Sequence, residues 1–489
     1  MVEIEISQTL TPVERMKRKI LLIEPPTFPK GVLSLSLSAV AAALPQEFTI
    51  SVLDLNISSI SELPELDEFL FIGVKVSSQN FHLAQEITHE IRQRNGEIKI
   101  IWGGEFPTLM PTECIAFCNS VVLGSFEPVC LQIIDDLTHN RLKPSYDGKG
   151  KYQLQGLSVP NVIHLYNPSN YYSFMGIPVE TSRGCDKKCT FCMVHSMQSK
   201  NDFKQYKILE EELAQYGGQF INVIDYNIGV HKEHLIRIAQ IFEQSEVLGW
   251  MGELCLESLD DDEILVALER SRCKMIYCGL ESLDEQSLKS VNKSKTNVLA
   301  NYERIIRKAQ SHGIQIAAGL ILGLEGMTHD SFTNTMRQFS EWGIIYTKMT
   351  FLTYNPGTKV KNSMRKKGTY LTEEFANYDG NHLSFIANGV DPKEVYSGSV
   401  QFIQQFYSLH SIQERAKNAG TTGKDQLEFI LFNLAYRNVY MDWLKYDIFT
   451  NDESFDELLK KRFVKSRNIK RLEFLLKKVR AEIANLKPA

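Results

Sequence analysis

The first 135 residues alternate short apolar, β-branched runs with segments of helical periodicity. Between two of these runs, Leu83, Ile87 and Ile91 recur at the spacing of one helix face. Strands that alternate with helices predict a parallel, doubly wound (Rossmann-like) α/β sheet, in which ligands bind beyond the carboxyl ends of the strands. The predicted strands cover residues 19–24, 48–55, 69–76, 98–102 and 121–124.

The alternation returns between residues 176 and 370, after a polar segment with Gly and Pro (136–175) that we interpret as a linker. Six β/α units predict a partial, open (β/α)6 barrel rather than a closed eightfold one. In such folds the functional groups lie at the C-terminal ends of the strands. The predicted strands cover residues 179–181, 220–225, 252–256, 275–279, 315–322 and 348–352.

The rest of the chain, residues 371–489, has a helical pattern and many aromatic residues. Residues such as Phe402, Phe406 and Tyr407 are expected to lie mostly in a core. We therefore predict a helical C-terminal domain that follows an α/β domain (1–135), the linker and the barrel (176–370).

The composition is that of a globular protein, with 489 residues, 43% hydrophobic, 23% charged and a net charge of −5. This charge gives no reason to expect nucleic acid as a partner. The longest nearly apolar stretch, 32–44, is too short to span a bilayer, and residues 1–11 lack the apolar core of a signal peptide. With an odd number of cysteines as well, these features predict a cytoplasmic protein without a membrane span.

Three cysteines, Cys185, Cys189 and Cys192, follow a strand-like run (178–182) with the spacing C-x3-C-x2-C. Three thiolates on one tight loop can each bind one iron of a four-iron cluster, which normally takes four protein ligands. One iron is then open for chemistry. A zinc knuckle with His195 as the fourth ligand is the alternative, although structural zinc ligands usually come as two separated pairs.

The other cysteines are interpreted as structural, because Cys114 and Cys118 share one helical face and the rest are scattered as single buried thiols. They are Cys114, Cys118, Cys130, Cys255, Cys273 and Cys278.

The segment from Thr181 to Cys192, with Phe191 before the last cysteine, resembles the signature of the radical S-adenosylmethionine (SAM) superfamily. The resemblance implies a 4Fe-4S cluster held by the three cysteines. In that superfamily the open iron chelates the amino and carboxylate groups of SAM, and one electron from the cluster cleaves SAM to a 5′-deoxyadenosyl radical. An electron donor such as flavodoxin or ferredoxin is implied as a partner.

Two further segments resemble the SAM-contacting motifs of this superfamily. Residues Gly279 to Ser282 have the sequence Gly-x-Glu-Ser, and residues Gly319 to Gly323 have the sequence Gly-x-Ile-x-Gly. Ser282 with Glu285 is also a helix capping pattern, and both interpretations can hold together. The residues that the resemblance implies as SAM contacts are Phe191, Asp225, Glu281, Ser282 and Gly323.

The N-terminal domain resembles the cobalamin-binding domain of the B12-dependent radical SAM enzymes. The resemblance rests on Gly103-Gly104 after the fourth predicted strand, on Gly124 and Glu127 after the fifth, and on their place before the cysteine motif. It implies cobalamin contacts at Ser77, Gly103, Gly104, Gly124 and Glu127.

The domain lacks the pattern Asp-x-His-x-x-Gly, so no histidine ligand to cobalt is expected from His82, His89 or His139. The absence also suits a domain that has lost cobalamin.

The resemblance implies a C-methyltransferase that acts on an unactivated carbon of a small molecule or peptide. One SAM supplies the methyl group by way of cobalamin, and a second SAM on the cluster supplies the radical. Three alternatives remain open: a cyclase or rearrangement enzyme with both cofactors, a radical SAM enzyme with a vestigial first domain, and a non-catalytic zinc or iron-sulfur protein. The sequence does not identify the substrate.

Overall fold

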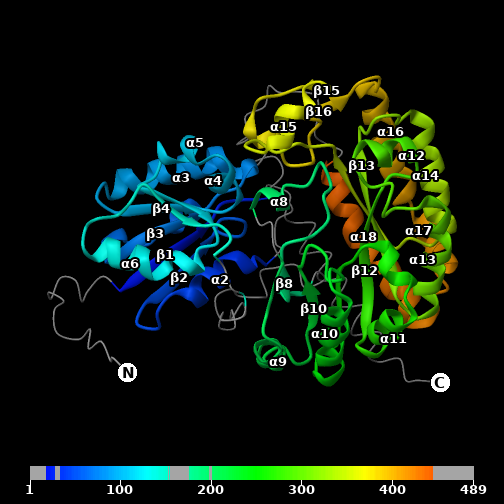
Figure 1. The fold of residues 1–489 in the computed structure, drawn as a ribbon, viewed down its shortest axis with the longest axis horizontal. Helices are drawn as coiled ribbons and strands as arrows, with labels where there is room; N and C mark the ends of the chain where they lie inside the picture. The colour runs from blue at the N-terminus through cyan, green and yellow to red at the C-terminus, as the bar shows by residue number, and fades with distance from the viewer. Residues whose placement is uncertain (1–17, 28–32, 152–153, 155–175, 198–200, 444–489) are drawn as a thin grey trace.

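The computed structural model describes residues 18–27, 33–151, 154, 176–197 and 201–443. Its N-terminal part is a parallel sheet with the strand order β2-β1-β3-β4-β5-β6 (Figure 1). The predicted doubly wound sheet is therefore confirmed. The strands are β1 (Lys19–Glu24), β2 (Thr49–Asp54), β3 (Phe69–Lys75), β4 (Lys99–Gly103), β5 (Ser120–Gly124) and β6 (Ser145–Gly148).

Helices cover both faces of this sheet, because its central strands are apolar on both sides. Leu21 and Ile23 of β1 pack into one core, and Ile20 and Leu22 pack into the other. The first core contains residues of α3 (Phe81–Arg94), α4 (Glu105–Leu109) and α5 (Pro111–Ile115). The second contains residues of α2 (Leu35–Ala43) and α6 (Cys130–Thr138).

The edge strand β6 lies within the segment that we expected to be a linker. Its Tyr146 is buried, and the Tyr146 hydroxyl donates a hydrogen bond of 2.9 Å to Asp136 Oδ2. The beginning of the 136–175 segment thus completes the first domain, and residues 155–175 lie outside the described part of the chain.

The central part is a second parallel sheet with the order β14-β13-β12-β11-β10-β7, which confirms the partial barrel (Figure 1). Its strands are β7 (Ile177–Val179), β10 (Phe220–Val223), β11 (Gly249–Glu253), β12 (Cys273–Glu281), β13 (Gln315–Leu322) and β14 (Thr347–Phe351). A short antiparallel pair, β8 (Ser182–Arg183) and β9 (Asp202–Phe203), brackets the cysteine motif.

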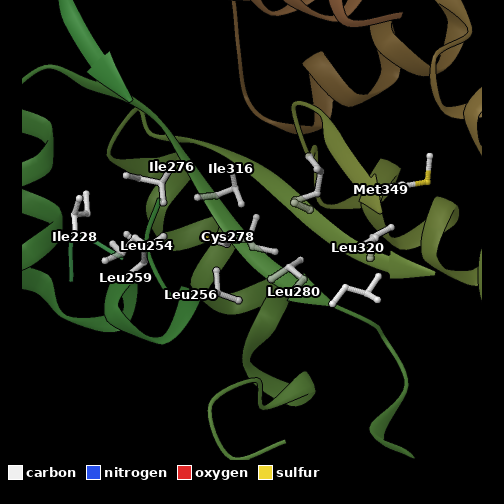
Figure 2. Packing of buried hydrophobic residues seen from close by; sticks show 14 of the residues in the cluster. Ile228, Leu254, Leu256, Leu259, Ile276, Cys278, Leu280, Ile316, Leu320 and Met349 are labelled. Atoms are coloured by element: carbon white, nitrogen blue, oxygen red, sulfur yellow. The ribbon is translucent and has the colours of Figure 1, made fainter. Parts of the chain in front are cut away.

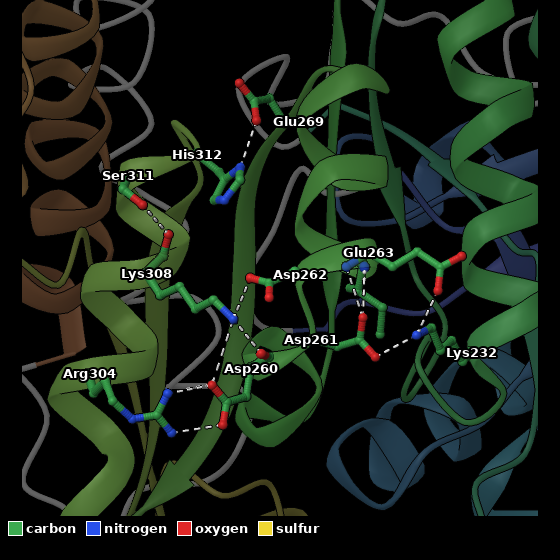
Figure 3. Close-up of polar contacts among 11 residues, drawn as sticks. Lys232, Asp260, Asp261, Asp262, Glu263, Glu269, Arg304, Lys308, Ser311 and His312 are labelled. Carbon is green, nitrogen blue, oxygen red and sulfur yellow. Dashed lines mark hydrogen bonds and ion pairs between the residues drawn. The ribbon is translucent and has the colours of Figure 1, made fainter.

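Helices cover the outer face of the barrel, and Figure 2 shows Ile276, Cys278 and Leu280 of β12 in the core between sheet and helices. The helices of this part are α8 (Val194–Met197), α9 (Tyr206–Ala214), α10 (Lys232–Gln244), α11 (Asp262–Arg270), α12 (Glu285–Ser290), α13 (Tyr302–Ser311) and α14 (His329–Glu341). Ion pairs such as Arg304–Asp260 and Lys232–Asp261 join the outer elements (Figure 3). They are exposed to solvent, so each contributes little to stability.

The C-terminal part packs on the barrel from two sides. Its elements are α15 (Lys359–Met364), β15 (Gly368–Tyr370), β16 (Phe385–Ala387), α16 (Pro392–Phe406), α17 (Leu409–Asn418) and α18 (Gly423–Trp443). Gly398 of α16 leaves room for the ring of Phe332 on α14, since a Cβ there would lie 2.3 Å from that ring. Phe402, Phe406 and Tyr407 are buried, as expected.

Helix α18 fills part of the concave side of the open barrel (Figure 1). Phe429 packs in one cluster with Met251 and Met275, and Tyr436 lies 4.4 Å from Tyr346 between ring centroids. The helix therefore closes the amino-terminal half of the barrel and leaves the carboxyl ends of the strands open. Within the described residues, no helix is both long and apolar enough to cross a membrane.

Candidate functional site

Two adjoining cavities lie where the carboxyl ends of both sheets meet. The interdomain cavity, of about 520 Å³, lies between the N-terminal sheet and the start of the barrel. The barrel cavity, of about 670 Å³, opens onto the concave side of the barrel. Lys75, Ser77, Glu105 and Tyr226 line both, so the two cavities share a wall.

All five residues expected to contact cobalamin line the interdomain cavity. Gly104 has a φ of 114°, and a Cβ there would lie 2.6 Å from the carbonyl oxygen of Val76. Gly124 has a φ of 77°, and a Cβ would lie 2.9 Å from the amide nitrogen of Lys149. Glycine is thus required at both positions by the backbone itself, beside any role in ligand approach. Gly103 differs, because a Cβ there would meet only Val122, at 4.0 Å.

Glu127 joins the two domains as well as lining this cavity. Its carboxylate accepts a hydrogen bond of 3.1 Å from Arg183 Nη1, at the start of the cysteine motif. Neither cavity is lined by His82, His89 or His139. The described residues therefore place glycine and carboxylate groups, but none of these three imidazoles, against the interdomain cavity.

Two acidic residues lie at or next to the shared wall: Glu105 lines both cavities, and the buried Glu24 pairs with Lys75, which also lines both. Glu24 Oε1 lies 2.7 Å from Lys75 Nζ, and burial raises the pKa of Glu24 although Lys75 opposes the shift. Burial also raises the pKa of Glu105, whose carboxylate accepts a hydrogen bond of 3.4 Å from the amide of Ser78. These groups give the wall hydrogen-bonding capacity in a partly dry environment.

The three motif cysteines line the barrel cavity together with Phe191. Their thiols are partly exposed, and the amide of Cys192 donates to the carbonyl oxygen of Cys189 at 3.2 Å. Three thiols on one loop that opens into a cavity fit a cluster with one open iron. The side chain of His195, the alternative zinc ligand, lies outside the described residues.

Glu281 also lines the barrel cavity, at the carboxyl end of β12. Its φ is 64°, a strained conformation for a side-chain-bearing residue, and the register of β12 shifts between Gly279 and Glu281. A Cβ at Gly279 would lie 2.4 Å from Glu281 Oε1, so the glycine makes room for the carboxylate. Burial raises the pKa of Glu281, and Lys293 at 3.2 Å opposes this shift.

The other three residues expected to contact SAM do not line the cavity. Asp225 is buried and accepts hydrogen bonds from the Thr181 amide at 2.7 Å and from Ser182 Oγ at 2.6 Å. Burial raises its pKa to about 6. Asp225 thus fixes the strand that leads to the cysteine loop.

Ser282 and Gly323 likewise have local roles. Ser282 Oγ accepts a hydrogen bond of 3.0 Å from the amide of Asp284, and Asp284 caps helix α12. The expectation that Ser282 is the helix N-cap is therefore wrong. Gly323 has a φ of 84°, and its amide donates to Met327 Sδ at 3.3 Å. Contact of Asp225, Ser282 and Gly323 with SAM stays a prediction.

Several cavity residues were missed by sequence reasoning. Cys255, interpreted as structural, lines the barrel cavity beside the cysteine loop, and Tyr226 lies next to the predicted Asp225. Lys293 follows α12 in a loop without a motif. Glu253, Tyr277 and Lys348 lie within or at the end of predicted strands, where only the alternation of inward and outward side chains marks them.

Residues 179–339 match the family "Radical SAM superfamily", and residues 28–133 match the family "B12 binding domain". The chain is 22% identical over 425 residues to bacteriochlorophyllide d C-12(1)-methyltransferase of Chlorobaculum tepidum, with 83% of this chain and 91% of the relative covered.

Solved structures share the fold at low sequence identity. The cobalamin-dependent S-adenosylmethionine radical enzyme OxsB, with aqua-cobalamin bound, is similar with a TM-score of 0.64 at 15% identity, over 96% of this chain and 81% of that one. The radical S-adenosylmethionine methyltransferase TsrM from Kitasatospora setae, with tryptophan and a SAM analogue bound, has a TM-score of 0.63 at 15% identity, over 87% and 99%.

Proposed function

The chain is a cobalamin-dependent radical SAM enzyme, and we propose that it methylates an unactivated carbon of a small molecule or peptide with two SAM per turnover. One observation carries the proposal: the cavity lined by the expected cobalamin residues and the cavity lined by the motif cysteines share a wall. A substrate in the barrel cavity could thus be reached from both sides. The methyltransferase relative supports this choice of reaction.

In this proposal each group of residues holds one cofactor. The cluster is held by Cys185, Cys189 and Cys192. SAM is held by Glu281, and cobalamin is held by the carboxyl edge of the N-terminal sheet around Gly103. When bound, the cluster with SAM supplies a 5′-deoxyadenosyl radical, and cobalamin supplies the methyl group.

The protein's own residues provide charge and orientation. The ammonium group of Lys293 favours the ionised form of Glu281 against its burial. An ionised carboxylate accepts hydrogen bonds from ribose hydroxyls or from an ammonium group, which are all donors. The Arg183–Glu127 ion pair ties the cysteine loop to the N-terminal domain. The pair thereby orients the two cavities relative to each other, which is the geometric contribution that such a reaction needs.

An external one-electron donor such as flavodoxin or ferredoxin would reduce the cluster, and the cytoplasm is the compartment in which we expect the reaction.

The test uses anaerobically purified protein, loaded with iron, sulfide and cobalamin, and SAM with a deuterated methyl group. A small-molecule extract of the native host serves as the substrate source. We expect a methylated product that carries the label, with S-adenosylhomocysteine and 5′-deoxyadenosine released in comparable amounts. Deoxyadenosine with a modified but unlabelled product would favour cyclisation or rearrangement. Failure to take up cobalamin under reducing conditions would leave a radical SAM enzyme with a vestigial first domain.

A further inference from the structure

Three polar side chains line the barrel cavity on its sheet side, below the carboxyl end where Glu281 lies. Glu253 ends β11 and is the register partner of Tyr277 on β12. Lys348 on β14 is the register partner of Gly319 on β13. A Cβ at Gly319 would lie 2.4 Å from the hydroxyl oxygen of Tyr277, so the missing side chain leaves room for this hydroxyl between β12 and β14.

The two charged groups of this set act on each other only at a distance. Among the residues that the structure describes, the side chains of Glu253 and Lys348 form no hydrogen bond or ion pair, and both are exposed and line the cavity. Burial by the surrounding protein raises the pKa of Glu253 to about 7; Lys348 opposes this shift and Glu281 adds to it. Both side chains are accessible to water, and a ligand that displaces this water has to pair with each charge, because a charge buried without a partner is costly.

The surroundings limit where such a ligand can lie. On the amino-terminal side, Phe429 and Tyr436 of α18 pack against the barrel wall. Asp379 also lines the cavity, and it is already engaged with His382, with 3.0 Å between Oδ1 and Nδ1. The free space therefore lies between the Glu253–Lys348 layer and the residues proposed to hold SAM.

We propose that Glu253, Tyr277 and Lys348 form the substrate subsite, and that the substrate is a small zwitterion. A cationic donor group, such as an ammonium, would pair with Glu253, and an anionic group, such as a carboxylate, would pair with Lys348. The Tyr277 hydroxyl supplies a hydrogen bond between them. A hydrocarbon ligand would bury both charges without partners, which disfavours it. The assignment of this ligand as the substrate rests on the proposed function; the binding preference does not.

The test is equilibrium dialysis of the cofactor-loaded protein, saturated with SAM, against a mixture of size-matched small molecules. The mixture contains zwitterionic, cationic, anionic and neutral members, and mass spectrometry measures the excess of each on the protein side. We expect zwitterions to be enriched over the other classes. Glu253→Gln and Lys348→Met should each lower their enrichment about tenfold or more, the effect of losing a charged hydrogen-bond partner.

Two exposed residues provide matched controls, since Glu243 on α10 and Lys274 on β12 line neither cavity. Glu243→Gln and Lys274→Met should leave the enrichment unchanged. Preferential binding of neutral molecules, or equal enrichment in wild type and both cavity variants, would overturn the proposal. Weakened SAM binding in Glu253→Gln would also overturn it, because the subsite would then belong to SAM. Dialysis involves no turnover, so a failure of methyl transfer in the labelling experiment is a separate result.

Discussion

Lys293 Nζ lies 3.2 Å from Glu281 Oε1, and both side chains are largely buried against the barrel cavity. The pair depends on the irregular end of β12. Asn297 Nδ2 donates hydrogen bonds to the carbonyl oxygens of Gly279, at 2.8 Å, and Leu280, at 3.1 Å, and so holds the strand in this shape. A strained residue fixed by its neighbours at a cavity is typical of a functional site.

Glu281→Gln should weaken SAM binding by about 1 to 3 kcal/mol, the cost of losing a charged acceptor, while the cluster is retained. Lys293→Met should weaken it as well, because Lys293 opposes the rise in the pKa of Glu281 that burial causes, and without it the neutral carboxyl, a weaker acceptor, is favoured. Dialysis with labelled SAM and an iron assay measure the two quantities.

The control for this experiment is Asp284→Ala, which removes the cap of α12. It should lower the stability of the helix by about 1 kcal/mol without changing the affinity for SAM. If Glu281→Gln binds SAM as tightly as wild type, Glu281 has only a structural role.

Replacement of Cys185, Cys189 and Cys192 by alanine should abolish both iron binding and the cleavage of SAM, because the three thiols share the loop that opens into the barrel cavity. Cys255→Ala is the matched control, since Cys255 lines the same cavity from the segment after β11 but lies outside the motif. We expect it to keep the cluster, as measured by iron content and electron paramagnetic resonance after reduction. Stoichiometric zinc in the native protein would instead support the zinc knuckle.

The strands of both sheets could be predicted because they are short apolar runs between helices, and the parallel topology follows from that alternation. The end of the predicted strand 220–225 located Asp225 but not the direction of its side chain. Side chains alternate along an extended segment, so Ile224 and Tyr226 face the cavities whereas Asp225 points into the protein. The strand Ser145–Gly148 was missed because its polar residues and glycine have a low strand propensity, which an edge position tolerates.

The position of α18 inside the barrel was beyond prediction for a different reason. An aromatic-rich helix is expected to be buried, but which surface buries it depends on contacts between segments far apart in sequence, such as Phe429 with Met251. The same holds for Lys293, whose partner Glu281 lies on another element.

Gly103→Leu should abolish cobalamin binding while the domain stays folded. The side chain would enter the interdomain cavity, and its Cβ would meet only Val122. Gly104 is a poorer test, because any side chain there clashes with the Val76 carbonyl and destabilises the fold itself. The visible absorption of bound cobalamin after gel filtration measures the effect, and circular dichroism checks the fold.

Replacement of His82, His89 and His139 together by alanine should leave cobalamin binding intact, since none of them lines the interdomain cavity or the barrel cavity. Loss of cobalamin from this triple variant would contradict the assignment of the site.

Arg415→Met should destabilise the C-terminal part by about 3 kcal/mol or more. The guanidinium is fully buried and donates to the carbonyl oxygens of Ile344, Ile345 and Phe406, at 2.7 to 2.8 Å, and to Asn433 Oδ1 at 2.9 Å. Arg415→Lys should not rescue stability, because an ammonium group cannot reproduce the planar fork of donors. Thermal unfolding measures the effect, with Arg237→Met, at a half-buried arginine of α10, as the control. Equal melting temperatures of Arg415→Met and the wild type would rule out this role of Arg415.

Binding of a cationic ligand in the barrel cavity should strengthen as the pH rises from 6 to 8. The pKa of Glu253 is about 7, so its carboxyl group is mostly neutral at pH 6 and mostly ionised at pH 8. The titratable groups that interact with it are Lys348, Glu281, Tyr277, Tyr346 and Tyr436. For a ligand that binds only the ionised form, the affinity changes about tenfold between pH 6 and pH 8.

The effect on protein stability has the opposite sign. The folded protein retains on Glu253 a proton that the unfolded chain loses near pH 4.5. The contribution of Glu253 to the free energy of unfolding therefore falls as the pH rises from there to about 7. Glu253→Gln should remove both dependences. The measurement is the enrichment of the cationic members of the mixture in dialysis at pH 6 and pH 8. A pH dependence that persists in Glu253→Gln would assign the titration to another group.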